Sequence, residues 1–136
     1  MPGGRWFDYA AGVNPNWEWL SRTALDEVQA LIRSLPRPVR AKAEPIAVLL
    51  EKRPGKALRA EGIEADTLGL FNGPSLRDGT DGEATPPHIV LYIENIWEAA
   101  DAAEAEYRRE IRTTYLHELG HYLGLEEDDL EERELE

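Results

Sequence analysis

Apolar residues recur along the chain at two different spacings, and each spacing predicts one kind of element. Near the N-terminus they stand three or four positions apart, at Leu25, Val28, Leu31, Ile32 and Leu35. This is the spacing of an amphipathic helix, which Thr23 and Asp26 would open as a capping box and Pro36 would end. The pattern therefore predicts an N-terminal helix over residues 23–35.

Three short apolar runs have the length and composition of strands. Residues 44–51 form a run bounded by prolines, residues 68–73 form a weaker run that ends in a turn, and residues 88–94 are the clearest strand. A continuously apolar strand is typical of the centre of a sheet, whereas an edge strand beside a site could pair with an extended peptide. For residues 88–94 both interpretations stay open.

A second helical pattern resumes near Ile96, is strong from Asp101 to Leu123 and stops at Gly124. Glycine at this position favours a left-handed cap, which turns the chain sharply after the helix. Together with the strands, the two helices predict an α+β fold. In it a small mixed sheet packs against the N-terminal helix and this later helix.

Chain length and the remaining segments predict the domain organisation. The 136 residues suffice for one domain and are few for two, so we expect a single domain over residues 1–136. It would include an aromatic-rich irregular arm at 1–20, a surface loop at 72–87 and an acidic segment at 126–136. The apolar runs are far shorter than the roughly 18 residues of a membrane span, and no signal-peptide pattern follows Met1. We therefore expect a cytoplasmic protein.

Charge and cysteine content narrow the classes of function. The chain has 27 acidic and 15 basic residues, with a formal net charge of −12. Such a charge repels phosphate backbones, so neither a nucleic-acid partner nor a membrane partner is expected. The absence of cysteine excludes disulfides, thiolate metal ligands and cysteine nucleophiles. The remaining candidates for chemistry are histidines and carboxylates.

The strongest chemical signal lies within the second helix, at His117-Glu118-Leu119-Gly120-His121. Histidines four positions apart share one helical face, so His117 and His121 can reach one metal ion, and neutral imidazole suits Zn²⁺. Glu118 lies about 100° round the helix from the first histidine, where it could act as general base on a water molecule. Two idle surface histidines are the competing interpretation.

A third metal ligand is expected close to the end of this helix. Catalytic zinc normally takes three protein ligands, and His88 is the one remaining histidine. Because fifteen residues follow His121, we expect a carboxylate brought back by the turn at Gly124, from among Glu126, Glu127, Asp128 and Asp129. His88 itself could stabilise an oxyanion or could be an ordinary exposed histidine.

The segment His117-Glu-Leu-Gly-His121-Tyr-Leu-Gly124-Leu-Glu-Glu127 resembles the extended motif of metzincin proteases, and still more the small bacterial minimal-zincin metallopeptidases. The resemblance covers about the last 50 residues, including the strand that begins at His88. It implies a zincin-like domain in which His117, His121 and Glu127 bind one zinc ion and Glu118 is the general base. Two features depart from true metzincins, which usually have histidine at the third position and a methionine turn beneath the metal; the one methionine here is Met1.

These features predict a zinc-dependent metallopeptidase that hydrolyses peptide bonds with a metal-activated water, acting on a peptide or protein substrate. The first alternative is a zinc-binding pseudo-enzyme or interaction module that keeps the site without turnover. An RNA-processing metallohydrolase is a third candidate, against which the net charge and the carboxylate ligand both argue. The sequence makes no prediction of oligomeric state.

Overall fold

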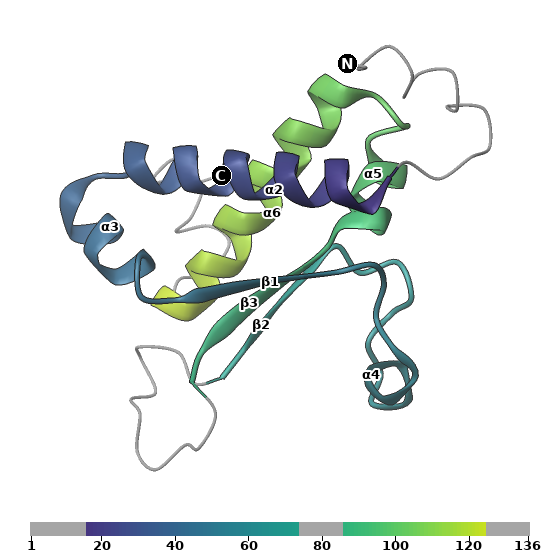
Figure 1. The fold of residues 1–136 in the computed structure, drawn as a ribbon. Coiled ribbons are helices and arrows are strands. Elements are labelled where there is room, and N and C mark those ends of the chain that lie inside the picture. Colours follow the sequence, from purple (N-terminus) through teal and green to yellow (C-terminus); the bar gives the residue numbers. More distant parts are fainter. Residues whose placement is uncertain (1–15, 74–85, 125–136) are drawn as a thin grey trace.

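The computed structural model describes residues 16–73 and 86–124, and Figure 1 labels their helices and strands. In chain order these elements are α2 (Trp17–Ser34), α3 (Arg37–Ala43), β1 (Ala47–Glu51), α4 (Lys56–Ala60), β2 (Gly69–Asn72), β3 (His88–Tyr92), α5 (Ile93–Ala99) and α6 (Glu104–Leu123). Helices and a small mixed sheet are both present, as the apolar patterns predict. The α+β fold class is confirmed.

The three strands form one sheet in the order β1-β3-β2. β1 runs parallel to β3, with Leu49 opposite Val90, and β2 runs antiparallel to β3, with Phe71 opposite Ile89. β3 is therefore the central strand, and its buried residues explain its continuously apolar sequence. The interpretation of residues 88–94 as an edge strand is wrong, because both sides of β3 are paired within the sheet.

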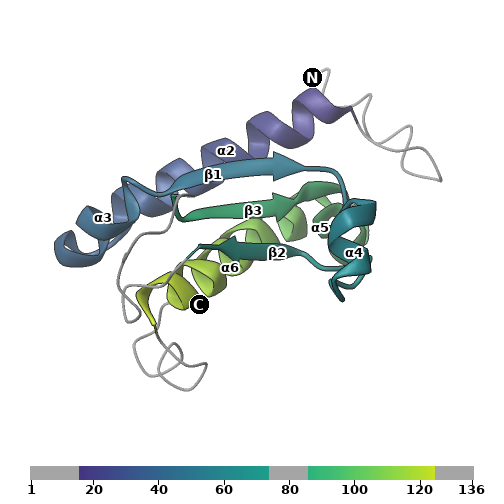
Figure 2. The same ribbon diagram turned by 90° about the horizontal axis from the view of Figure 1, so that it is seen from below.

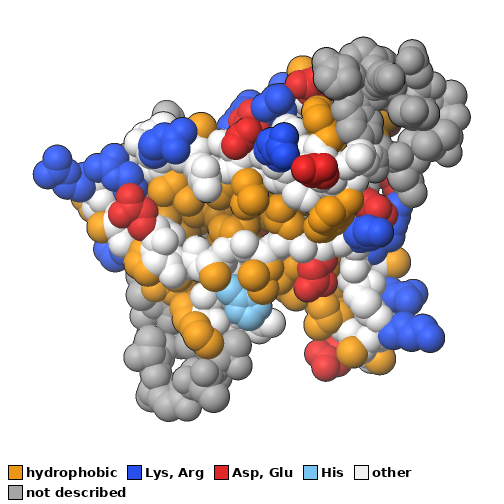
Figure 3. All heavy atoms as spheres, viewed as in Figure 1, with side chains coloured by type: hydrophobic (Ala, Val, Ile, Leu, Met, Phe, Trp, Pro, Cys, Tyr) orange, Lys and Arg blue, Asp and Glu red, His pale blue; other side chains and the backbone are white. Residues whose placement is uncertain are grey.

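The helices α2 and α6 pack on one face of this sheet, as Figures 1 and 2 show from two directions. Side chains alternate between the faces of a strand, so Ile89 and Leu91 of β3 point into the core while Val90 and Tyr92 point away from the helices. Figure 3 shows hydrophobic side chains between α2 and the strands and charged side chains along the outer side of α2. This is the amphipathic packing that the helical periodicity predicts.

The N-terminal helix begins earlier than expected. Asn16 is its N-cap, and the Asn16 Oδ1 accepts hydrogen bonds from the backbone N–H groups of Glu18 at 2.6 Å and Trp19 at 3.4 Å. Thr23 is 5% exposed in the interior of α2, so the capping box that it forms in sequence does not open the helix. The assignment of residues 17–20 to an irregular arm is also wrong, because they form the first turn of α2, with Leu20 in the core.

The other boundaries agree with the sequence patterns to within a few residues. The strand over 88–94 ends at Tyr92, and residues 93–94 already belong to α5. Gly124 caps α6 in the left-handed conformation, with φ of 79°, as predicted. The short helices α3 and α4 were not expected, because five to seven residues beside prolines carry no periodic signal.

None of the helices within residues 16–73 and 86–124 combines the length and the apolar character that crossing a membrane requires.

Candidate metal centre

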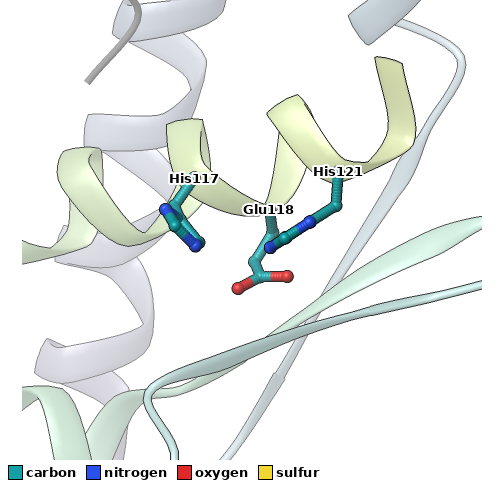
Figure 4. Close-up of side chains that lie close together, drawn as sticks. All are labelled: His117, Glu118 and His121. Atoms are coloured by element: carbon teal, nitrogen blue, oxygen red, sulfur yellow. The ribbon is translucent and has the colours of Figure 1, made fainter. Parts of the chain in front are cut away.

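The last turns of α6 carry the predicted site, and the packing of the helix determines which way it faces. Leu116, Leu119 and Gly120 are buried against the core, with Leu116 7% and Leu119 1% exposed. Because successive helical residues are rotated by about 100°, the residues between these buried positions point away from the core. This rotation of the helix brings His117, Glu118 and His121 out together (Figure 4).

These three side chains form a compact donor group. One ligand atom from each, an imidazole nitrogen or a carboxylate oxygen, lies within 4.8 Å of the others. The imidazole centroids of His117 and His121 are 4.8 Å apart and their planes are inclined at 81°. In Figure 4 the Glu118 carboxylate lies between the two rings and points toward the strands. Two imidazoles on one helical face are donors that Zn²⁺ accepts, so His117 and His121 fit this ion, with the Glu118 carboxylate beside them.

Glu118 lies in a partly buried environment between α6 and β2. Burial raises the pKa of the Glu118 carboxyl above its ordinary value, while the electrostatic interaction with His117 and a hydrogen bond from the Phe71 backbone N–H partly offset this effect. A carboxylate with a raised pKa exchanges protons more readily near neutral pH than an exposed one. The arrangement is therefore suited to proton transfer beside a bound cation.

The structure brings some of the predicted site residues together and separates another from them. His117, Glu118 and His121 form the group, whereas His88 is not part of it. His88 begins β3 on the face turned away from the helices, and its Nδ1 lies 3.1 Å from the Pro86 carbonyl oxygen. Glu127, like its alternatives Glu126, Asp128 and Asp129, lies outside the described residues. The assignment of the metal ligands thus stays a prediction.

Two residues near the site were not found from the sequence. Phe71 contributes its backbone N–H to Glu118, and Gly69 lies against α6 beside Thr114 and Glu118. A backbone donor leaves no trace in the amino-acid type. The glycine did carry a signal, because glycine inside a strand often marks a place where another element approaches closely.

The chain was compared with known proteins. Residues 43–136, which include the three strands, α6 and the whole HExxH segment, match the family described as zincin-like metallopeptidase. A search of curated proteins found no match to the chain.

Proposed function

Because the chain belongs to the zincin-like metallopeptidase family, we propose that it is a zinc-dependent peptidase that hydrolyses peptide bonds. The observation that carries the proposal is the group of His117, Glu118 and His121, whose ligand atoms lie within 4.8 Å of one another on one side of α6. His117 and His121 would hold the ion, with Glu127 as third ligand and Glu126 or Asp128 as alternatives. When bound, Zn²⁺ would supply Lewis acidity to the peptide carbonyl and to the attacking water.

In this proposal Glu118 is the general base. Its carboxylate takes a proton from the attacking water and later gives this proton to the leaving amine. Glu118 is suited to both steps because it lies between the two imidazoles and its burial raises its pKa.

The edge strand β2 would align the substrate. The N–H of Tyr92 donates to the carbonyl of Leu68 at 2.9 Å. Hydrogen-bonded pairs alternate along an antiparallel ladder, so the next such pair is Leu70 with Val90. The backbone N–H and C=O groups of Gly69 and Phe71 therefore point away from β3. The Phe71 N–H is donated to Glu118, so an extended peptide could pair beside α6 with the remaining outward groups of β2, those of Gly69 and the Phe71 carbonyl. The role considered for residues 88–94 thus passes to β2, which lies at the edge.

Metal analysis combined with peptide cleavage tests the proposal. We expect the purified wild type, reconstituted with zinc, to hold one ion and to cleave members of a peptide library. Glu118→Gln should retain zinc and lose turnover by about a hundredfold or more, because only the proton-transferring group is removed. His117→Ala should lose zinc. Glu110→Gln, a matched change two turns earlier on α6, should behave as wild type.

The alternative outcomes separate the candidate functions. A wild type that holds zinc and cleaves no peptide is the zinc-binding module, and a chain that never takes up zinc contradicts both functions. Equal turnover of Glu118→Gln and wild type would exclude Glu118 as the base. The same zinc measurement identifies the third ligand, since Glu127→Gln should weaken zinc binding more than Glu126→Gln or Asp128→Asn.

A further inference from the structure

Gly69 lies where β2 comes closest to α6. It faces the helix side of the sheet, opposite Leu91. A Cβ atom at this position would lie 2.6 Å from Cγ2 of Thr114 and 3.3 Å from Cγ of Glu118. The first distance is far below van der Waals contact, so a side chain would force the strand and the helix apart. Only glycine, which has no Cβ atom, fits between β2 and α6 at this position without displacing them.

Thr114 has little freedom to move away. It is 7% exposed on α6, one turn before Glu118, and it neighbours the fully buried Tyr115. Cγ2 of a β-branched threonine is held close to the helix surface, because its χ1 angle is restricted. The Gly69–Thr114 contact therefore sets the gap between β2 and this part of α6.

The same gap determines how Glu118 meets the strand. Phe71 is two residues beyond Gly69, on the same side of β2, and its backbone N–H donates to the Glu118 carboxylate. Phe71 also packs its ring against Tyr122 of α6, with the ring centroids 5.6 Å apart. A strand displaced at Gly69 would carry the Phe71 amide away from Glu118.

We propose that Gly69 is a positioning residue, which by packing on Thr114 holds β2 close enough to α6 for the Phe71 N–H to orient the Glu118 carboxylate. The catalytic consequence rests on the proposed peptidase function, because an orientation of Glu118 matters for turnover only if Glu118 is the base. The structural consequence is independent of turnover. Gly69 acts on the reaction through Glu118 and does not itself contact reacting atoms.

Hydrogen exchange of the Phe71 amide, followed by NMR, tests the placement without any substrate. Removing the acceptor in Glu118→Ala should expose this amide. Gly69→Ala should speed its exchange by about tenfold or more relative to wild type, because the displaced strand loses the carboxylate acceptor. Thr114→Ser removes the Cγ2 atom that the new methyl group would meet, so Gly69→Ala/Thr114→Ser should recover the slow exchange. Gly55→Ala is the matched control, because nothing lies within 4 Å of a Cβ at Gly55.

Turnover supplies the second measurement. On a peptide that the wild type cleaves, Gly69→Ala should lower kcat by about a hundredfold, as expected for a base displaced by about 1 Å, while zinc affinity stays unchanged. The double variant should recover kcat. If Gly69→Ala does not fold, the double variant is compared with Thr114→Ser alone. The two should then have the same Phe71 amide exchange and the same kcat.

Unchanged Phe71 exchange in Gly69→Ala, or no recovery in the double variant, would overturn the proposal. A wild type that cleaves no peptide would instead defeat the peptidase function, and the exchange measurement would still decide the role of Gly69.

Discussion

The N-terminal half of α6 (residues 104–113) and its C-terminal half (residues 114–123) belong to one continuous helix but contact the rest of the molecule differently. In the N-terminal half, the buried Tyr107 stacks on Trp19 and meets Trp97 edge to face, and its hydroxyl donates to the Leu20 carbonyl at 2.8 Å. In the C-terminal half, apolar residues face the core while His117, Glu118 and His121 gather on the other side, beside β2.

Ion pairs sharpen the contrast. Glu27 of α2, which is 16% exposed, accepts hydrogen bonds from Arg108 at 2.9 Å and Arg112 at 2.7 Å. These two arginines of the N-terminal half therefore bind α6 to α2. In the C-terminal half the burial of Glu118 raises its pKa, which is a cost to folding. The comparison indicates that the first half is held by aromatic contacts and ion pairs to other helices, whereas the second half combines core packing with a partly buried carboxylate that is unfavourable for folding.

Tyr107→Ala is expected to have the largest effect. It removes a fully buried aromatic ring, so the free energy of unfolding of the metal-free protein should fall by about 3–5 kcal/mol, measured by urea denaturation. Tyr107→Phe, which loses only the hydrogen bond to Leu20, should cost about 1 kcal/mol. If the two halves are distinct, zinc affinity of the folded Tyr107→Phe protein stays at the wild-type value. A parallel loss of zinc binding would break the comparison.

Glu27→Gln should have an intermediate effect that depends on pH. Burial alone would raise the pKa of Glu27, but the hydrogen bonds and charges of Arg108 and Arg112 lower it below the ordinary value. Because the folded-state pKa is depressed, the stabilisation is complete above the ordinary pKa of about 4.3 and is lost as the pH falls through the folded-state value. We expect the variant to be about 1–2 kcal/mol less stable than wild type at pH 7.

The difference between the two proteins should shrink when urea denaturation is repeated at pH 3, since the neutral glutamine has no proton to gain. Glu110→Gln serves as the control and should show no comparable change. A stability difference between Glu27→Gln and wild type that is equal at both pH values would mean that the pairing with the arginines does not stabilise the fold.

Ala102→Gly should have the smallest effect, and it should increase stability. Ala102 and Asp101 precede α6 with φ of 58° and 57°, a conformation that costs an alanine roughly 1–2 kcal/mol. Glycine relieves this strain and loses part of the gain to its more flexible unfolded chain, so a net gain of about 0.5 kcal/mol is expected from urea denaturation. Ala105→Gly, inside the first turn of α6, should instead destabilise the protein; a gain of equal size there would show that the strain at Ala102 is not the cause.

Elements with a clear hydrophobic periodicity could be predicted from the sequence. An element boundary for which two nearby residues were equally suitable could not. Gly124 and the run of α6 followed from local patterns, since capping and helical spacing act over a few residues. The start of α2 was missed because Asn16 and Thr23 are both acceptable caps, and the burial of Leu20 decides in favour of Asn16. That choice depends on a core that no local pattern describes.

The candidate site likewise has a part that the sequence predicts and a part that it does not. The spacing of His117, Glu118 and His121 is enough to place two imidazoles and a carboxylate together, because one turn of a helix has the same geometry wherever it stands. The position of β2 at the edge of the sheet, the hydrogen bond from Phe71 and the close packing at Gly69 arise instead from contacts between segments far apart in the chain. Such contacts depend on which faces meet when the sheet packs on the helices, and folding in three dimensions alone establishes them.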